Sequence, residues 1–340
     1  MAGKGAPETV LVYSGEDISG DGLIKLPFIG GLRAAFPASR ITWCAASGRS
    51  VYAGWLAPVV EGLIDEVLLD GRPGLQPLDW IATQRPFGGR TFDLVIDTQA
   101  KLSMTLAARR GAGRGGRFIS SAARFALSSV RPREPWPVAM SDQLALLLRL
   151  AGGETARPVP IRLTDKRLLD AARSLLPDGP IYVGIGPGAG GADRRWPIER
   201  YVEVARRQWE RGRTPVFVLG PAEVDYIPIL RQTAPFVLLP GVDLDEALRD
   251  VDSPLLTIAL AGRMAAAVAA DAGPGHMLAA GGAPLVSLFC EPRKLAKFRP
   301  ASPRLEPLIA EDFGGKEIDR IPVDAVDAAL ERLLAASTAL

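Results

Sequence analysis

Residues 181–211 read IYVGIGPGAGGADRRWPIERYVEVARRQWER, and this stretch decides the fold. Its apolar start, residues 181–186, predicts a buried strand, and residues 198–211 repeat apolar side chains at helical spacing. A glycine-rich loop joins the two and ends at Pro197, a residue that suits the first turn of a helix. Strands that alternate with helices in this way imply a parallel sheet that is covered on both faces.

The same alternation continues in both directions along the chain. The strands that it predicts are residues 9–14, 40–45, 66–69, 92–97, 181–186, 215–219, 236–239, 265–270 and 285–289. The helices that it predicts are residues 23–36, 141–151, 166–176, 198–211, 223–232 and 323–336, with Ser141 as an N-cap. Because the rhythm restarts after a proline-rich stretch at 156–163, the sequence predicts an α/β protein. We expect two Rossmann-like domains, residues 1–165 and 166–340, that face a central cleft.

The composition agrees with this assignment and excludes several classes of protein. A chain of 340 residues is long enough for about two domains. Its 48% hydrophobic and 23% charged residues are ordinary for a globular protein, so disorder is not expected. The single histidine and the two cysteines exclude zinc hydrolases built on two or three histidines, and they exclude cysteine-rich metal clusters.

The cysteines and the apolar stretches predict the compartment. Cys44 and Cys290 lie far apart and neither belongs to a C-x-x-C pair, so a reduced chain is a simpler interpretation than one long-range disulfide. The first residues lack the apolar core of a signal peptide. Gly262 and Arg263 interrupt the most apolar stretch, residues 254–270, so no run reaches the roughly 18–20 apolar residues that span a bilayer. We therefore expect a soluble, cytoplasmic protein.

A segment of single-sign charge stands out in a chain whose net charge is only +2. Between Thr98 and Arg133 there is no Asp or Glu, whereas the basic residues are Lys101, Arg109, Arg110, Arg114, Arg117, Arg124, Arg131 and Arg133. Such a segment can be a solvated helix face, but its length favours an anionic partner: a phosphorylated substrate, a membrane surface or nucleic acid. Nucleic acid is the weakest of these, because only Phe118 and Phe125 accompany the cations and the chain as a whole is nearly neutral.

The loop after the first predicted strand, residues 14–27, carries a candidate catalytic carboxylate. Asp21 lies between Gly20 and Gly22 where a helix is predicted to open, and a helix N-terminus stabilises an anionic side chain. The spacing alone favours a capping Asp over a catalytic one. The loop contains no G-x-G-x-x-G, so the sequence does not support a dinucleotide fingerprint.

Two loops of the second half have the composition of anion-binding sites. Residues 184–197 place four glycines and the pair Arg194 and Arg195 before a helix, and a guanidinium fork can bind two phosphate oxygens at once. Residues 271–280 again combine small residues with a helix start after a strand. His276, the only histidine, lies there; we expect it to form a hydrogen bond to a ligand or to the loop backbone, and not to ligate a metal.

Together the loops resemble family 9 glycosyltransferases, the ADP-heptose:lipopolysaccharide heptosyltransferases. The residues that carry the resemblance are GDGLIKLP at 20–27, FDLVIDTQ at 92–99, GPGA at 186–189 with RWPIERY at 195–201, LGPAE at 219–223, and DAGPGH at 271–276. They stand in register over most of the chain, from about residue 9 to residue 300.

The resemblance implies a GT-B fold and an inverting transfer that needs neither a metal nor another cofactor. Asp21 would be the general base that deprotonates the acceptor hydroxyl. The implied donor-binding residues of the second domain are Gly186, Gly188, Ala189, Arg194, Arg195, Glu223, Asp271, Ala272, Gly273, Pro274 and His276. The acceptor-binding residues expected on the first domain are Lys25, Gln99, Lys101, Arg109, Arg110 and Arg117. The partners would be an ADP-linked nucleotide sugar and an anionic glycolipid of the lipopolysaccharide core, with contact to the inner face of the cytoplasmic membrane.

Two other functions stay open from the sequence. The family usually has Lys at the position of Arg194 and often Asn-Asp-Ser/Thr where this chain has Ala270-Asp271-Ala272, which motivates a non-catalytic or donor-altered GT-B relative that only binds a nucleotide or a nucleotide sugar. A different enzyme with two Rossmann-like domains, such as a nucleotide-sugar epimerase or an NAD-linked oxidoreductase, is the other alternative. The missing G-x-G-x-x-G argues against the oxidoreductase.

Overall fold

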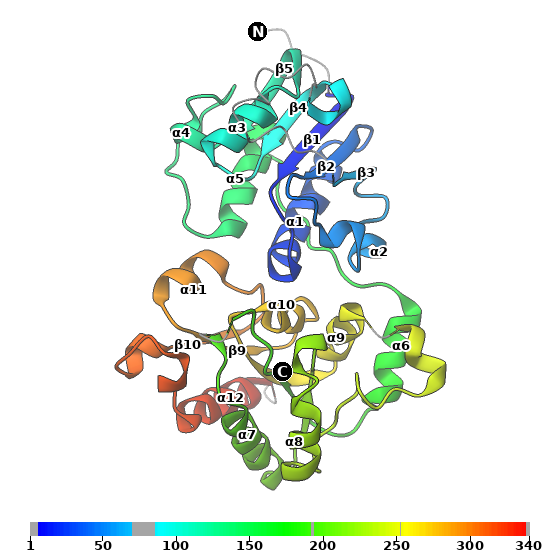
Figure 1. The fold of residues 1–340 in the computed structure, drawn as a ribbon, viewed down its shortest axis with the longest axis vertical. Coiled ribbons are helices and arrows are strands. Elements are labelled where there is room, and N and C mark those ends of the chain that lie inside the picture. The colour runs from blue at the N-terminus through cyan, green and yellow to red at the C-terminus, as the bar shows by residue number, and fades with distance from the viewer. Residues whose placement is uncertain (1–5, 70–85, 192–193, 252, 338–340) are drawn as a thin grey trace. The chain divides into compact units, whose positions relative to one another are not determined.

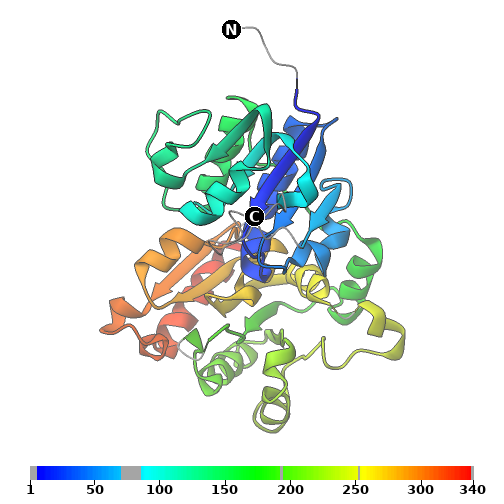
Figure 2. The same ribbon diagram turned by 45° about the horizontal axis from the view of Figure 1, so that its top comes forward.

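The computed structural model describes residues 6–69, 86–191, 194–251 and 253–337. The chain divides into two units, Met1–Ile161 and Arg162–Leu340, where the sequence predicts a boundary at 165/166. Each unit is an α/β body with a five-stranded, entirely parallel sheet, seen as a set of arrows flanked by helices (Figures 1 and 2).

The first sheet has the strand order β3-β2-β1-β4-β5. Its strands are β1 (Thr9–Ser14), β2 (Arg40–Ala45), β3 (Glu66–Leu68), β4 (Phe92–Asp97) and β5 (Ala112–Ser120). β1 lies in the middle and is buried on both faces, which is why its sequence is a continuous apolar run without alternation. In Figure 1 the β3 end of this sheet carries α2 (Ala57–Val60), and the β5 end carries α3 (Leu102–Arg109) and α4 (Ala122–Phe125).

β5 is a strand that the sequence pattern does not predict. Its residues AGRGGRFIS hold three glycines and two arginines, and a register shift against β4 falls between Phe92 and Leu94. Only Phe118 and Ile119 are apolar and buried. Backbone pairing with β4 therefore makes this strand, because its side chains alone give no period of two.

The helices of the first unit correct two predictions. α1 (Ser19–Ala35) begins four residues before the predicted start at 23, so Gly20, Asp21 and Gly22 lie in its first turn and not in a loop. α5 (Met140–Gly152) has Ala139 at its N-cap, so the prediction of Ser141 as the cap is wrong. The two helices approach closely, because a Cβ atom at Gly31 would lie 2.6 Å from Leu148 Cδ2.

The second sheet has the strand order β10-β9-β8-β6-β7. Its strands are β6 (Tyr182–Gly186), β7 (Thr214–Phe217), β8 (Met264–Ala270), β9 (Leu285–Phe289) and β10 (Leu305–Ile309). The predicted strand at 236–239 is wrong: Leu238 forms only an isolated bridge to Val216. The pairing cannot continue past Leu239, since Pro240 has no N–H group to donate. β10 was not predicted.

The helices of the second unit cover both faces of its sheet. They are α6 (Lys166–Leu175), α7 (Ile198–Glu210), α8 (Tyr226–Thr233), α9 (Pro254–Ala261), α10 (Gly273–Ala280), α11 (Pro292–Phe298) and α12 (Val323–Ser337). The helix predicted at 223–232 is two elements, a 3-10 turn (Pro221–Glu223) and α8. The most apolar stretch, 254–270, is α9 followed by β8, and no helix in the described ranges is long and apolar enough to cross a membrane.

An ion-pair network joins the end of α7 to α12. Asp327 is 6% exposed and accepts hydrogen bonds from Arg211 Nη1 at 2.7 Å, Arg211 Nη2 at 2.8 Å and Gln208 Nε2 at 2.8 Å. Burial opposes the charged carboxylate, but Arg211 and its neighbours still hold the pKa of Asp327 below its usual value. This network contains none of the residues predicted to bind donor or acceptor.

Candidate functional site

Each sheet has one point where the strand order reverses, and parallel sheets bind ligands at the carboxyl ends of the strands at that point. In the first unit the chain passes from β1 to β2 and β3 on one side and then to β4 and β5 on the other, so the reversal lies between β1 and β4. In the second unit it lies between β6 and β8. The predicted anion-binding loops follow β6 and β8, and Asp21 lies in the first turn of α1, which follows β1.

The two loops of the second unit are in contact. A Cβ atom at Gly186 would lie 3.0 Å from Pro274 Cβ, so a side chain at this position would have to push the start of α10 away. Arg194 Nη1 donates to the backbone oxygen of Asp271 at 3.3 Å, which ties the glycine-rich loop to the start of α10. α10 has Ala272 at its N-cap, and no N-cap side chain accepts a hydrogen bond from the N–H groups of its first turn.

Two buried titratable groups lie at this junction. Asp271 and His276 are each 7% exposed. Burial raises the pKa of Asp271, and the positive charges of Arg194 and Lys294 partly offset that rise. Burial lowers the pKa of His276 from 6.5 to about 4, so at neutral pH the imidazole is uncharged and can donate one hydrogen bond and accept another.

Glu223 lies against the glycine-rich loop from the β7 side. Its Oε2 accepts a hydrogen bond from the Gly220 N–H at 3.0 Å, and a Cβ atom at Gly188 would lie 3.0 Å from the same oxygen. The carboxylate is 7% exposed. The structure therefore brings the LGPAE and GPGA segments together, as the predicted donor site requires.

A pocket of about 400 Å³ adjoins Glu223 between the end of β7, α9 and α10. Apolar side chains dominate its lining, which includes Val218, Val242, Leu256, Thr257, Leu260 and Met277. Sequence reasoning missed these residues, because they come from four separate segments and none belongs to a motif. Of the remaining predicted donor residues, Ala189 and Gly273 are half-buried, and Arg195 is exposed beside Arg194.

In the first unit, Asp21 and Gln99 lie at the reversal between β1 and β4. Asp21 is half-buried in the first turn of α1, whose N-cap is Ile18, so the interpretation of Asp21 as the capping residue is wrong. Gln99 follows β4, and its side chain lies over Gly15, where a Cβ atom would come within 2.4 Å of Gln99 Oε1. Gly15 therefore lies against the predicted site residue Gln99, although none of the motifs includes it.

Asp97 shapes the turn that carries Gln99. Its carboxylate is fully buried and accepts hydrogen bonds from Thr105 Oγ1 at 2.5 Å, Ser120 Oγ at 2.8 Å and the Gln99 N–H at 2.9 Å. Burial raises the pKa of Asp97, while these donors oppose the rise. Ala100, the next residue but two, has a left-handed φ of 56°, which shows how tightly the turn is held.

The predicted acceptor residue Lys25 is not available to a ligand. Its side chain is 3% exposed, and Nζ donates to Asp17 Oδ1 at 2.6 Å and to Ser14 Oγ at 3.0 Å. The ammonium is used inside the fold because it faces a buried carboxylate. This result corrects the expectation that Lys25 contacts the acceptor.

The structure also separates the predicted acceptor arginines from Gln99. Arg117 donates to the carbonyl oxygens of Leu150 at 2.7 Å and Ala151 at 2.8 Å, so it caps the end of α5. Arg109 donates to the Leu127 oxygen and lies 5.5 Å above the Phe118 ring. Arg110 is exposed just before Gly111, which pairs with Phe92 at the amino end of β4. Lys101, exposed at the start of α3, stays at the carboxyl end near Gln99.

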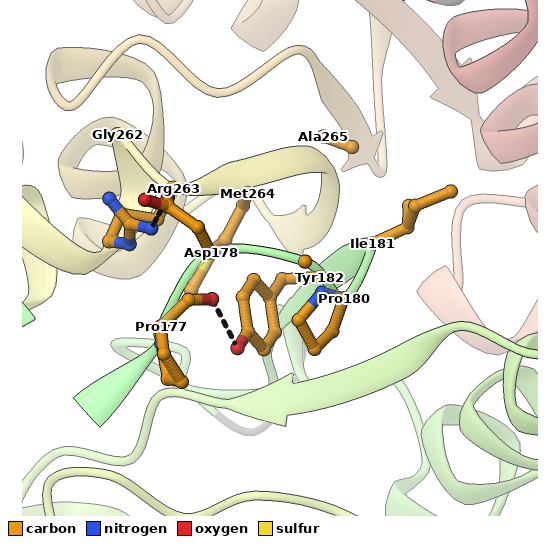
Figure 3. A pocket seen from close by; sticks show the side chains of 10 residues that line it. Pro177, Asp178, Pro180, Ile181, Tyr182, Gly262, Arg263, Met264 and Ala265 are labelled. Carbon is orange, nitrogen blue, oxygen red and sulfur yellow. Dashed lines mark hydrogen bonds and ion pairs between the residues drawn. The ribbon is translucent and has the colours of Figure 1, made fainter. Parts of the chain in front are cut away.

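Another hollow lies at the opposite end of the second sheet, where β6 and β8 begin (Figure 3). Asp178 pairs with Arg263, and the Tyr182 hydroxyl donates to the Pro177 oxygen at 2.8 Å. These polar groups satisfy one another, and none of the predicted site residues lines the hollow. Among the described residues, no three His, Cys, Asp or Glu side chains gather as a metal site.

A family model described as glycosyltransferase family 9 (heptosyltransferase) matches residues 80–317. The chain belongs to this family. No curated protein matches it. A family 9 glycosyl transferase from Veillonella parvula has 21% identity and a TM-score of 0.70, with 97% of this chain and 98% of that chain covered. Escherichia coli WaaC with ADP has 16% identity and a TM-score of 0.64, with 96% and 99% covered. The E. coli ADP-heptose lipopolysaccharide heptosyltransferase II has 16% identity and a TM-score of 0.61, with 97% and 99% covered. At these identities the likeness shows the shared GT-B fold.

Proposed function

We propose that this family 9 glycosyltransferase transfers a heptose from ADP-heptose to a lipopolysaccharide-core or related glycan acceptor, with inversion and without a metal. The observation that carries the proposal is the junction of the two loops at the β6–β8 reversal, where Gly186 touches Pro274 and Arg194 reaches Asp271. E. coli WaaC, whose structures hold ADP and an ADP-heptose analogue, supports ADP as the nucleotide. On this proposal the donor binds the second unit and the acceptor binds the first.

The donor diphosphate would lie against Gly188 and Ala189 and on the first turn of α10. Uncapped N–H groups and the Arg194 and Arg195 guanidinium groups would stabilise the charge that develops on the leaving diphosphate. Neutral His276 would add a hydrogen bond and no charge. These groups perform the task that a divalent cation performs in other transferases.

The nucleoside would extend from the diphosphate toward β7. The Glu223 carboxylate is placed to accept hydrogen bonds from ribose hydroxyls, since its Oε2 already faces the glycine loop. The adjoining pocket, lined by Leu256, Thr257 and Met277, is large and apolar enough for the adenine base.

On the first unit, Asp21 would act as the general base. Its carboxylate would take the proton of the acceptor hydroxyl while that oxygen attacks the anomeric carbon from the face opposite the diphosphate. The new C–O bond forms as the bond to the diphosphate breaks, so configuration inverts and ADP leaves. Gln99, held over Gly15 beside the same strand ends, would orient the acceptor.

The acceptor would be anionic and lipid-linked. In the part of the chain that the structure describes, no carboxylate forms an ion pair with the exposed Arg110, Arg114, Arg124, Arg131 or Arg133, whereas Arg206 and Arg207 of α7 are both paired with Glu203. Phe118 and Phe125 are buried, so they cannot stack on nucleobases. We propose that Arg124, Arg131 and Arg133, which follow the carboxyl end of β5, meet a phosphorylated core glycolipid together with Lys101 at the inner face of the cytoplasmic membrane.

Calorimetry with ADP, UDP and GDP on the full chain tests the donor half of the proposal. We expect ADP to bind and UDP and GDP to bind much more weakly. Incubation with ADP-heptose and a deacylated core acceptor should then release ADP only when acceptor is present. ADP binding without transfer would favour a non-catalytic relative, for which Arg194, Ala270 and Ala272 are the motivating substitutions; preference for another nucleotide would favour a donor-altered one.

A further inference from the structure

Asp17 and Lys25 form a buried ion pair, and they lie four residues before and four residues after the proposed base Asp21. Asp17 is 2% exposed in the loop after β1, Lys25 is 3% exposed in the second turn of α1, and Asp21 lies midway between them. Asp17 lies outside the segments that carry the family resemblance, and Lys25, which belongs to the GDGLIKLP segment, is too buried for the ligand-binding role that the sequence predicts for it. Neither ligand binding nor the family resemblance therefore explains why this ion pair is buried here.

Asp17 joins four parts of the first unit through one carboxylate. Its Oδ1 accepts hydrogen bonds from Lys25 Nζ at 2.6 Å and from Ser14 Oγ at 2.7 Å, at the end of β1. Its Oδ2 accepts from Trp43 Nε1 of β2 at 2.7 Å and from Ser50 Oγ at 3.0 Å. The backbone of Asp17 adds two more bonds, to the Arg49 oxygen and from the Val51 N–H.

The start of α1 depends on this carboxylate because it has no cap. Ile18 is the N-cap, and no side chain caps the helix there, so the usual device that fixes a helix start is missing. Two side-chain contacts attach this end of α1 to the rest of the unit: Lys25 donates to Asp17 at 2.6 Å, and the Tyr52 hydroxyl donates to the Gly22 oxygen at 2.8 Å. Asp21 is in the turn between these two attachments.

Stability alone does not account for a buried pair at this place. A buried ion pair is often no more stabilising than apolar residues of the same size, because both charges must be desolvated. Such a pair does fix the relative position of the two elements that carry it, because each buried charge must stay in contact with its partner. Tyr52 shows that both carboxylates are near: burial raises the pKa of its hydroxyl, and the charges of Asp17 and Asp21 raise it further.

We infer that Asp17 and Lys25 are a positioning pair, which holds the first turn of α1 so that the Asp21 carboxylate meets the acceptor hydroxyl. The inference rests on the proposed role of Asp21 as base. It assigns no contact with donor or acceptor to either residue. It also explains why a lysine is kept in a buried position on a helix that carries no other buried charge in its described length.

The test compares Asp17→Asn and Lys25→Met with Asp21→Asn and with a control, Asp327→Asn. The control breaks a buried carboxylate–arginine pair of the second unit and contacts none of the proposed site. For each full-length variant we would measure the melting temperature, kcat, and the ADP dissociation constant. We expect Asp17→Asn and Lys25→Met to lower kcat by about 10²-fold, as a misplaced catalytic group does, while the ADP dissociation constant stays at the wild-type value. Asp327→Asn should lower the melting temperature and leave kcat unchanged.

A double variant keeps the test decisive if a single variant does not fold. Asp17→Asn with Lys25→Met leaves no buried charge unpaired, so it should fold, and it still lacks the bond from the loop to α1. We expect its kcat to stay low, and the Trp43 indole N–H resonance to move, since its acceptor is no longer a carboxylate. Wild-type kcat in the folded single variants or in the double variant would overturn the inference while leaving Asp21 as base. Wild-type kcat in Asp21→Asn would instead overturn the proposed base, and the pair would then have nothing to position.

Discussion

His276 makes the second unit sensitive to acid in a way that can be calculated. In the folded protein burial holds the pKa of this imidazole at about 4, against 6.5 in the unfolded chain. Between these two values the unfolded chain binds a proton that the folded protein does not bind. Stability therefore falls as the pH drops below 6.5, and the loss is complete below about pH 4.

The size of the effect follows from the shift. The difference between a pKa of 6.5 and one of about 4 corresponds to about 3 kcal/mol in total, and between about pH 7.5 and about pH 5 the loss is about 2 kcal/mol. The perturbation is His276→Gln, which keeps a polar side chain of similar length but does not titrate. The wild type should lose about 2 kcal/mol more than the variant over this pH interval.

Urea unfolding at the two pH values measures the difference. Because the two units need not unfold together, the second unit should be followed on its own, through hydrogen exchange of the amides of β6 and β8. The carboxylates contribute equally to the pH dependence of unfolding in both proteins, so their contribution cancels in the comparison. The same pH dependence in the wild type and in His276→Gln would refute the burial of a neutral imidazole at the start of α10.

Three further predictions concern the two loop sites. Gly15→Ala should lower kcat without changing ADP affinity, measured by steady-state kinetics and calorimetry, because the new Cβ would lie 2.4 Å from the Gln99 oxygen and must displace that side chain. Gly188→Ala should weaken ADP binding by about tenfold in calorimetry, because its Cβ would come within 3.0 Å of the Glu223 carboxylate and overpacking costs about 1–3 kcal/mol. Thr257→Trp should weaken ADP by a similar factor and leave binding of inorganic diphosphate unchanged, because it fills only the pocket proposed for the base; equal loss of both ligands would place the nucleotide elsewhere.

The sequence predicts the sheets and the loops where local signals decide the structure. Four of the predicted strands have the same bounds in the structure: residues 9–14, 40–45, 92–97 and 285–289. The glycine loop after β6 and the loop after β8 meet at the β6–β8 reversal, as the site requires. These features can be predicted because they depend on neighbouring residues only: an apolar run followed by small residues indicates where a buried strand ends.

The sequence misses what depends on distant partners. The spacing does not predict where α1 begins, because Gly20 and Gly22 suggest a turn. The residue at the N-cap, Ile18, is apolar and gives no sign of a helix start. The role of Lys25 depends on Trp43 and Ser50, which reach the same carboxylate from other elements. β5 forms by pairing with β4 and not by its own pattern, so the sequence predicts a ligand for Arg117, whereas in the fold its guanidinium caps α5.

Asp21→Asn tests the central claim most directly, measured as acceptor-dependent ADP release from ADP-heptose together with the ADP dissociation constant of the same preparation. The substitution keeps the size of the side chain and replaces a carboxylate, which can take a proton, by an uncharged amide, which cannot. The account predicts that ADP release falls by about 10²-fold or more while ADP binds as tightly as to the wild type. Wild-type release by Asp21→Asn would contradict it, since the proton of the acceptor would then go to another group.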